Sequence, residues 1–259
     1  MPAVALTIAG SDPSGGAGIQ ADLKTFHQFG VYGQAVITLV TVQNTKSVYQ
    51  VHMLAASLVA DQIQAVVSDM PPAAAKTGAL GSAEIAEAVA NWARSSGIPL
   101  IVDPVMISKD GAPLLSTEAQ YVVKQRLLPL AAVVTPNIPE AELLTGRSIR
   151  TEDEMIAAAR HLVDLGCQAV IVKGGHREGE PLDIFQDGAG TLRLAGRRVE
   201  TRHTHGTGCT FSAALTAGMA LGASARDAAR QAKSFVQRAI ETAPGLGGGQ
   251  GPLNHFAEP

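Results

Sequence analysis

Cysteine is scarce in this sequence: only Cys167 and Cys209 occur among its 259 residues. Two cysteines cannot build a disulfide framework, and such low usage is typical of a reducing compartment. Long apolar runs are also missing, because none reaches the roughly 18 residues that a membrane-spanning helix needs. The N-terminal segment MPAVALTIAG lacks the basic residues and the long apolar run of a secretory signal. We therefore expect a cytoplasmic protein with no membrane partner.

The sequence also lacks an excess of positive charge. Its 20 lysines and arginines face 23 aspartates and glutamates, for a formal net charge of -3. The basic residues are scattered, so no basic stripe predicts nucleic-acid binding. Small molecules or other protein chains remain as the expected partners. With 46% apolar residues the chain can bury one large core, and we expect a single domain over residues 1–259.

Short apolar runs alternate with longer segments of helical period along most of the chain. The runs expected as strands cover residues 3–10, 34–43, 74–80, 99–105, 131–137 and 169–175. The segments expected as helices cover residues 18–30, 57–70, 82–97, 117–128 and 151–166. Strands that are apolar throughout, separated by amphipathic helices, predict βαβ units. The expected fold class is therefore α/β, a three-layer αβα arrangement with a mostly parallel central sheet.

The pattern changes after Gly175. Residues 181–202 predict an antiparallel hairpin that turns at residues 187–190, DGAG. Two helical segments follow, at about 208–221 and about 223–240. Residues 244–256, PGLGGGQGPLNHF, have the composition of a flexible terminus.

A mostly parallel sheet binds its ligands at the carboxyl ends of its strands. The residues that follow the expected strands are therefore the candidates for a site: residues 10–18, Gln43, Asp103, Asn137 and Lys173.

The loop GSDPSGGAGIQAD, residues 10–22, is rich in glycine. It contains Gly16-x-Gly18-x-x-Ala21, which matches the dinucleotide fingerprint, but no acidic residue ends the second strand to hold a ribose. It is not a P-loop, because no Lys-Ser or Lys-Thr pair directly follows one of the glycines. We interpret it as a turn that lets a ligand approach the backbone closely. Asp22 lies one turn into the next helix, where it either contacts that ligand or is solvated.

Two carboxylates near strand ends could hold a cation. Asp103, in VDPVM, needs a basic or cationic partner, or backbone hydrogen bonds in the following turn. Asn137 and Glu140, in TPNIPE, have the spacing of a helix cap and its third residue, and a capping pair explains both. The alternative is that Glu140 orients a metal-bound water. The acidic run TEDE is instead the expected start of a helix, with Thr151 as its cap.

Two further motifs predict contacts with an anion. Lys173, in VKGGH, ends a strand, from where it can reach a phosphate or remain a surface charge; His176 in the same motif has no assigned role. In HGTGC, the glycines can turn the amides of Thr207, Gly208 and Cys209 toward one point at the start of a helix. That arrangement predicts an anion hole.

A zinc site of His203, His205 and Cys209 is the alternative for this stretch. We disfavour it because zinc sites take three or four ligands of good geometry, and no fourth candidate lies nearby in the sequence.

Taken together, these motifs resemble the ribokinase-like superfamily of small-molecule kinases. Within it, the chain is most similar to the hydroxymethylpyrimidine/phosphomethylpyrimidine kinases of thiamine biosynthesis. The similarity covers essentially the whole chain, through ALTIAGSDPSGGAGIQADLKTF, VITLVTVQNT, VDPVM, TPNIPEAELLTG, VKGGH, HGTGCTFSAAL and GPLNHF. It implies a ribokinase-like fold and ATP-dependent phosphorylation of 4-amino-5-hydroxymethyl-2-methylpyrimidine, then of its monophosphate to the diphosphate.

The resemblance also implies roles for individual residues. The pocket for the pyrimidine would be lined by Gly10, Asp22, Gln43, Ala79 and Val105. Mg²⁺ would be held, largely through water, by Asp103 and Glu140. ATP and the transferred phosphoryl group would be bound by Lys173, Gly206, Thr207, Gly208 and Cys209. A homodimer is also implied.

Cys209 is the expected base. A thiol at a helix N-terminus can have its pKa lowered by several units, which predicts a thiolate at neutral pH. An alcohol must lose a proton during the transfer, whereas a monophosphate with a second pKa of ~6 is already mostly deprotonated. We therefore expect Cys209 to matter more for the first transfer than for the second.

Three other functions stay open on the sequence alone. Pyridoxal kinase activity is the nearest, because pyridoxal also offers a hydroxymethyl group on a flat ring, and because the family often has methionine where this chain has Ala79. A non-catalytic nucleotide-binding module is disfavoured, since binding alone needs no base. A dinucleotide-dependent oxidoreductase rests only on the glycine pattern of the first loop.

Overall fold

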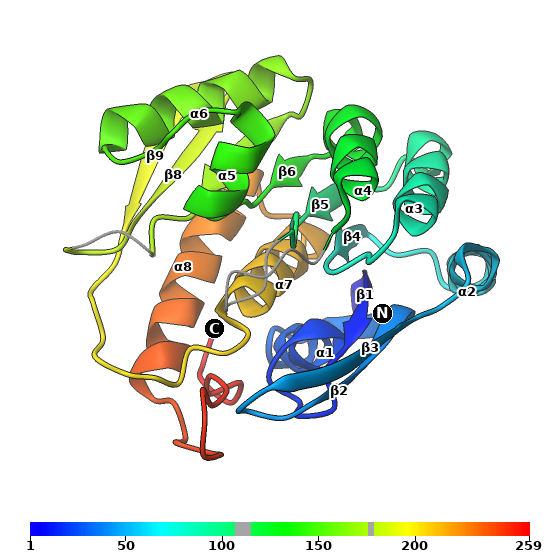
Figure 1. Cartoon of the computed structure of the whole chain (residues 1–259), viewed down its shortest axis with the longest axis horizontal. Helices are drawn as coiled ribbons and strands as arrows, with labels where there is room; N and C mark the ends of the chain where they lie inside the picture. Colours follow the sequence, from blue (N-terminus) through cyan, green and yellow to red (C-terminus); the bar gives the residue numbers. More distant parts are fainter. Residues whose placement is uncertain (107–114, 176–178) are drawn as a thin grey trace.

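The computed structural model describes residues 1–106, 115–175 and 179–259, so His176 lies outside the described residues. Its strands are β1 (Val4–Ser11), β2 (Tyr32–Gln43), β3 (Val48–Met53), β4 (Ala74–Thr77), β5 (Leu100–Val102), β6 (Val133–Val134), β7 (Ala169–Val172), β8 (Leu182–Asp187) and β9 (Gly190–Ala195). In the described ranges these nine strands form one sheet of order β3-β2-β1-β4-β5-β6-β7-β8-β9 (Figure 1). Pairing is parallel from β2 through β7 and antiparallel for β3 at one edge and for β8 and β9 at the other.

Helices cover both faces of this sheet (Figure 1). One face carries α1 (Gly18–Gln28), α7 (Thr207–Ala220) and α8 (Ala225–Glu241). The other face carries α2 (Ala56–Asp69), α3 (Ala83–Ser96), α4 (Thr117–Val122), α5 (Ile138–Thr145) and α6 (Glu152–Asp164). From α4 the chain continues through one π-helical turn (Val123–Leu127) and one 3-10 turn (Leu128–Leu130). The predicted α/β class, with three layers and a mostly parallel sheet, is confirmed.

The central parallel strands are largely apolar because they contribute side chains to two cores. Leu6 and Ile8 of β1 point to the core under α2 to α6. Ala5 points to the opposite face of the sheet and lies in the core under α7 and α8. In β5, Ile101 lies in one core and Val102 in the other. A strand covered on both faces cannot alternate polar and apolar residues.

One strand was not expected from the sequence. β3 pairs antiparallel with β2, and each of its six residues is exposed. Because β3 buries no side chain, its composition carries no pattern of burial from which a strand could be predicted. The hairpin of β8 and β9 is confirmed, with Asp187 paired to Gly190 across the turn.

The expectation of a flexible C-terminal segment is wrong. Leu253 and His255 are buried, and the amide of Gln250 donates a hydrogen bond to the Thr45 carbonyl at 2.8 Å. Glycine permits this packing because a Cβ at Gly249 would collide with the backbone of Thr45. The glycines here allow close backbone contact and do not mark disorder.

No helix in the described ranges is both long and apolar enough to cross a bilayer.

Candidate active site

Three of the predicted residues, from three separate segments, meet at the carboxyl edge of the sheet. Asp103 follows β5, Lys173 follows β7, and Gly208 lies in the first turn of α7. Lys173 Nζ lies 3.1 Å from Asp103 Oδ1. A Cβ on Gly208 would lie 3.3 Å from Lys173 Nζ and 3.8 Å from Asp103 Oδ2. The strand-end rule therefore located the centre of the candidate site.

Asp103 is held by two hydroxyl groups that the sequence analysis did not single out. Thr135 Oγ1 donates to Asp103 Oδ1 at 3.2 Å, and Ser212 Oγ donates to Asp103 Oδ2 at 3.2 Å. Asp103 is 3% exposed, so these donors and Lys173 replace the water that the carboxylate loses on burial. Thr135 could have been found from its place directly after β6, at the same edge of the sheet.

Glu140 forms a capping box with Asn137. The Asn137 amide donates to Glu140 Oε2 at 2.8 Å, and the Glu140 amide donates to Asn137 Oδ1 at 2.9 Å. The capping interpretation is confirmed, as is the one for TEDE, where Thr151 caps α6. Burial nevertheless raises the pKa of Glu140 to about 7, opposed by the positive charge of Lys173. The cap thus accounts for one carboxylate oxygen of Glu140. The negative charge of Glu140 also interacts with the ammonium group of Lys173.

Lys173 keeps its charge in this setting. Burial alone would lower the pKa of its ammonium group, but Asp103 and Glu140 raise it, and the net shift is upward. A permanently charged ammonium group beside the start of α7 is suited to an anionic ligand.

The start of α7 depends on Gly206. This N-cap residue has a φ of 81°, and a Cβ on it would collide with the carbonyl of Gly16. The amide of Thr207 donates to the Thr204 carbonyl at 3.3 Å, so it is already engaged. The amides of Gly208 and Cys209 lie in the first helical turn, where they have no acceptor within the helix. Two of the three amides expected for the anion hole therefore fit that role.

The expectation of a Cys209 thiolate is wrong for the free protein. Burial raises the pKa of the Cys209 thiol to about 11, although the charge of Lys76 and a hydrogen bond from the Gly18 amide oppose the shift. The loss of solvent around the sulfur outweighs both of these effects. Cys209 is therefore protonated at neutral pH before any ligand binds.

A buried ion pair beside Cys209 was missed by the sequence analysis. Lys76 Nζ lies 2.8 Å from Asp22 Oδ1, neither side chain is exposed, and Thr7 Oγ1 donates to Asp22 Oδ2 at 2.6 Å. Burial alone would lower the pKa of Lys76, but Asp22 raises it. A lysine within the buried strand sequence AAKT was the signal that could have found this pair. Asp22 is fully buried with both oxygens engaged, so the alternative that it is solvated is wrong; its contact with the pyrimidine stays a prediction.

The glycines of the first loop are explained by packing. A Cβ on Gly18 would collide with the Gly10 carbonyl, and one on Gly16 would lie 2.6 Å from His205 Cδ2. The match to the dinucleotide fingerprint therefore needs no nucleotide to account for it.

The residues predicted to contact the pyrimidine ring occupy different places near this edge. Gln43 ends β2, and its Nε2 lies 3.4 Å from His205 Nε2. Val105 lines a small cavity together with Asp103 and Thr77. Gly10 is buried against Leu39, and the Ala79 carbonyl accepts a hydrogen bond from Thr38 at 2.6 Å. Their contact with a substrate stays a prediction.

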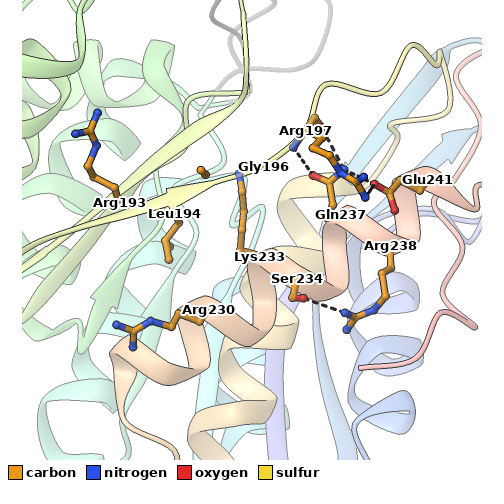
Figure 2. A pocket seen from close by; sticks show the side chains of 11 residues that line it. Arg193, Leu194, Gly196, Arg197, Arg230, Lys233, Ser234, Gln237, Arg238 and Glu241 are labelled. Carbon is orange, nitrogen blue, oxygen red and sulfur yellow. Dashed lines mark hydrogen bonds and ion pairs between the residues drawn. The ribbon is translucent and has the colours of Figure 1, made fainter.

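A larger groove lies apart from these residues, between β9 and α8, with a volume of about 520 Å³ (Figure 2). Its basic side chains are Arg193, Arg197, Arg230, Lys233 and Arg238. The first four pair with Glu152, Glu241, Asp227 and Asp183, and Arg238 donates to the Glu258 carbonyl. None of the residues predicted for the site is among those described as lining it. Because four of these five cations are already paired with carboxylates, the groove is a weaker candidate for an anion than the start of α7.

The donor set around Lys173 suits Mg²⁺. Over residues 1–106, 115–175 and 179–259, no three His, Cys, Asp or Glu side chains form a ready ligand cluster. Mg²⁺ does not require one, because it keeps several waters and uses one or two carboxylates together with substrate phosphates. Asp103 and Glu140 supply two such carboxylates, both close enough to Lys173 to raise its pKa.

Comparisons with known proteins show the family of the chain. The phosphomethylpyrimidine kinase family matches residues 12–254. A hydroxymethylpyrimidine/phosphomethylpyrimidine kinase from Bacillus subtilis (strain 168) is 48% identical over 98% of this chain and 94% of its own length. A crystal structure of phosphomethylpyrimidine kinase from Clostridium difficile 630 has a TM-score of 0.83 at 43% identity, over 92% of this chain and 99% of that one. The structure of an ADP complex of Bacillus subtilis pyridoxal kinase has a TM-score of 0.92 at 37% identity, over 99% of this chain and 98% of that one. The expected resemblance is confirmed, and this chain belongs to the phosphomethylpyrimidine kinase family.

Proposed function

We propose that this protein transfers the γ-phosphoryl group of ATP to the hydroxymethyl group of 4-amino-5-hydroxymethyl-2-methylpyrimidine, and then a second one to the resulting monophosphate. The observation that carries the proposal is the meeting of Lys173 and Asp103 at the start of α7. Family membership supports the same reaction, and the ADP complex of a structural relative supports a nucleotide as the donor.

Each transfer breaks the bond between the γ-phosphorus and the oxygen that bridges it to ADP. A new bond joins the phosphorus to the acceptor oxygen, and in the first transfer the alcohol proton passes to a base, either the Cys209 thiolate or solvent water. Such reactions depend mainly on positioning and on stabilising negative charge. We assign Lys173 to the ATP phosphates, and the amides of Gly208 and Cys209 to the transferred group. Thr207 and Gly206 shape the same turn.

Asp103 and Glu140 would hold Mg²⁺, largely through water. When bound, Mg²⁺ would neutralise phosphate charge. Gln43 would hydrogen-bond the aminopyrimidine edge, whereas Gly10, Asp22, Ala79 and Val105 would shape the rest of the pocket.

The role of Cys209 needs a separate test, because its thiol starts out protonated. If Cys209 serves as the base, it must first lose its own proton to solvent when the ligands bind, and Cys209→Ala should then reduce kcat for the alcohol by roughly 10² to 10⁴ and reduce kcat for the monophosphate much less. Equal losses in the two transfers would show that Cys209 only shapes the anion hole. Cys209→Ser serves as the matched control, because it keeps the size and the backbone amide while replacing the thiol.

Pyridoxal is the second candidate acceptor. The close structural similarity to a pyridoxal kinase favours it, and so does the small side chain at Ala79. The deciding experiment is ATP turnover with the hydroxymethylpyrimidine, its monophosphate and pyridoxal side by side. A higher kcat/KM for pyridoxal would overturn the proposed function.

We further propose a homodimer formed through β2 and β3. The exposed apolar side chains on these strands are Tyr32, Val40, Val42, Val48, Tyr49, Val51 and Met53. β3 is the edge strand of the sheet, beside β2 (Figure 1), and exposed apolar side chains at a sheet edge are typical of an interface. Light scattering should show a dimer that Val51→Asp dissociates and that Leu221→Asp, on an exposed residue at the end of α7, leaves intact.

We also propose that residues 1–259 form one domain, which the continuous sheet supports. A cytoplasmic location is proposed as well, and the low cysteine content supports it.

A further inference from the structure

His205 lies between the first loop and the end of β2. Its Nε2 is 2.7 Å from Asp12 Oδ2 and 3.4 Å from Gln43 Nε2. The His205 side chain is 16% exposed and that of Asp12 is 5% exposed, so little water competes for these contacts. One ring nitrogen thus faces both a carboxylate and the amide predicted to contact the pyrimidine.

The carboxylate determines where the ring carries its proton. Burial alone would raise the pKa of Asp12. Hydrogen bonds from His205 and Ser14 lower it by more, so the pKa lies below its usual value. The Ala17 amide also donates to Asp12 Oδ2, at 3.0 Å. An ionised carboxylate only accepts hydrogen bonds, so His205 Nε2 must carry a hydrogen and donate it to Asp12.

This proton in turn constrains the amide of Gln43. An Nε2 that carries a hydrogen has no lone pair, so it cannot accept from a second N–H group. The favourable arrangement turns the Gln43 amide so that Oε1 faces His205 and the NH₂ group faces away. The Nε2–H group of His205 donates mainly to Asp12 and only secondarily faces Oε1, so the amide offers a ligand an N–H donor and, through Oε1, an acceptor. That pair complements a ring nitrogen next to an exocyclic amino group.

The backbone around both residues is held by the same C-terminal segment. The His205 amide donates to the Gly251 carbonyl at 3.1 Å, and the ring of His205 packs on Gly16. Two residues beyond Gln43, the Thr45 carbonyl accepts from the Gln250 amide. His205 and Gln43 therefore cannot move apart without breaking the contacts of residues 249–252.

We propose that His205 is a positioning residue that fixes the orientation of the Gln43 amide, and thereby selects an acceptor whose ring nitrogen adjoins an amino group. This inference rests on the proposed function for the identity of the acceptor. It concerns a histidine that has no part in the transfer itself.

Substitution at position 205 offers a matched pair of variants. The side-chain nitrogen of His205→Gln can take the place of the histidine Nε2, whereas that of His205→Asn cannot reach it. We expect His205→Asn to raise KM for the aminopyrimidine about tenfold, the loss expected for one hydrogen bond. His205→Gln should stay within about threefold of the wild type, and KM for ATP should change less than about twofold in both variants. Preference for the aminopyrimidine over pyridoxal should fall in His205→Asn.

A double-mutant cycle tests whether the effect passes through Gln43. In a Gln43→Ala background, His205→Asn should cause no further rise in KM for the aminopyrimidine. Melting temperatures establish that each variant is folded, and Asp12→Asn replaces His205→Asn if the latter is not. Equal KM values for the Gln and Asn variants, or an equal rise in KM for ATP, would overturn the inference. If the wild type phosphorylates only pyridoxal, the proposed function fails, and the same cycle measured with pyridoxal still decides whether His205 acts through Gln43.

Discussion

Lys76 donates a hydrogen bond to Asp22 at 2.8 Å in the interior of the protein, where neither side chain has exposed surface. Taking two charges out of water costs several kcal/mol for each ion, and their attraction offsets that cost only if both stay in place. The pair lies close enough to Cys209 for Lys76 to oppose the rise in the pKa of the thiol. Lys76 lowers and Asp22 raises the pKa of this thiol, so both charges act on the start of α7, although neither partner needs to touch a ligand.

Removing one partner of this pair should destabilise the protein strongly. Lys76→Met leaves Asp22 buried without its cation, which we expect to lower the free energy of unfolding by about 3 to 5 kcal/mol. The double variant Lys76→Met/Asp22→Leu should lose less than the single variant, because no uncompensated charge remains. Urea denaturation followed by circular dichroism measures both. A single variant within about 1 kcal/mol of the wild type would show that the pair is neutral in the folded protein.

The layers of the fold and the centre of the candidate site were predicted from the sequence for the same reason. Buried parallel strands must be apolar, so a polar residue directly after one is conspicuous. Asp103 and Lys173 were found in this way, and the structure places them 3.1 Å apart.

What the sequence did not predict depends on contacts between distant segments. β3 is exposed along its length and carries no pattern of burial. His205 was considered only as a metal ligand, because its proximity to Asp12 and Gln43 arises from the packing of three segments that are remote in the chain. The thiolate was expected from the helix N-terminus alone, whereas the loss of solvent around Cys209 depends on the whole fold.

Gly206 should tolerate no side chain. In Gly206→Ala the new Cβ collides with the Gly16 carbonyl, so the start of α7 must shift and the amides of the anion hole shift with it. Losing such donors costs roughly 10² to 10³ in kcat. The matched control is Gly30→Ala, whose φ of 71° is also positive but whose Cβ would meet nothing within 4 Å. It should cost about 1 to 2 kcal/mol of stability and leave kcat unchanged. Similar kinetics for the two variants would contradict the assigned role of the turn.

Cys209 should react slowly with alkylating reagents at neutral pH. A thiol whose pKa is raised to about 11 is almost entirely protonated at pH 7, so its rate with iodoacetamide should rise about tenfold per pH unit from 7 to 10. Cys167, with a pKa raised by burial to about 12, should react more slowly still. Mass spectrometry of the intact protein and of its peptides separates the two sites. A rate that levels off near pH 8 would show that the thiolate forms in the free protein after all.

His255 should make the stability of the protein depend on pH. Burial lowers the pKa of His255 from 6.5 to about 4, and its Nε2 lies 3.1 Å from Thr210 Oγ1 in the first turn of α7. The unfolded chain therefore takes up a proton on His255 below pH 6.5 that the folded protein resists. The contribution of His255 to the free energy of unfolding is therefore fully present above pH 6.5. It falls by about 3 kcal/mol in all as the pH drops from 6.5 to 4.

The measurement for His255 is a set of urea denaturation curves between pH 4 and 8, compared with those of His255→Gln. The variant keeps a polar group for Thr210 but has no proton to gain, so its free energy of unfolding should fall less steeply between pH 6.5 and 4. Carboxylates contribute equally to both proteins, and the difference between the two curves isolates the histidine. Parallel curves would mean that His255 already takes up its proton in the folded state, and that the packing of the C-terminal segment on α7 does not depend on a neutral ring.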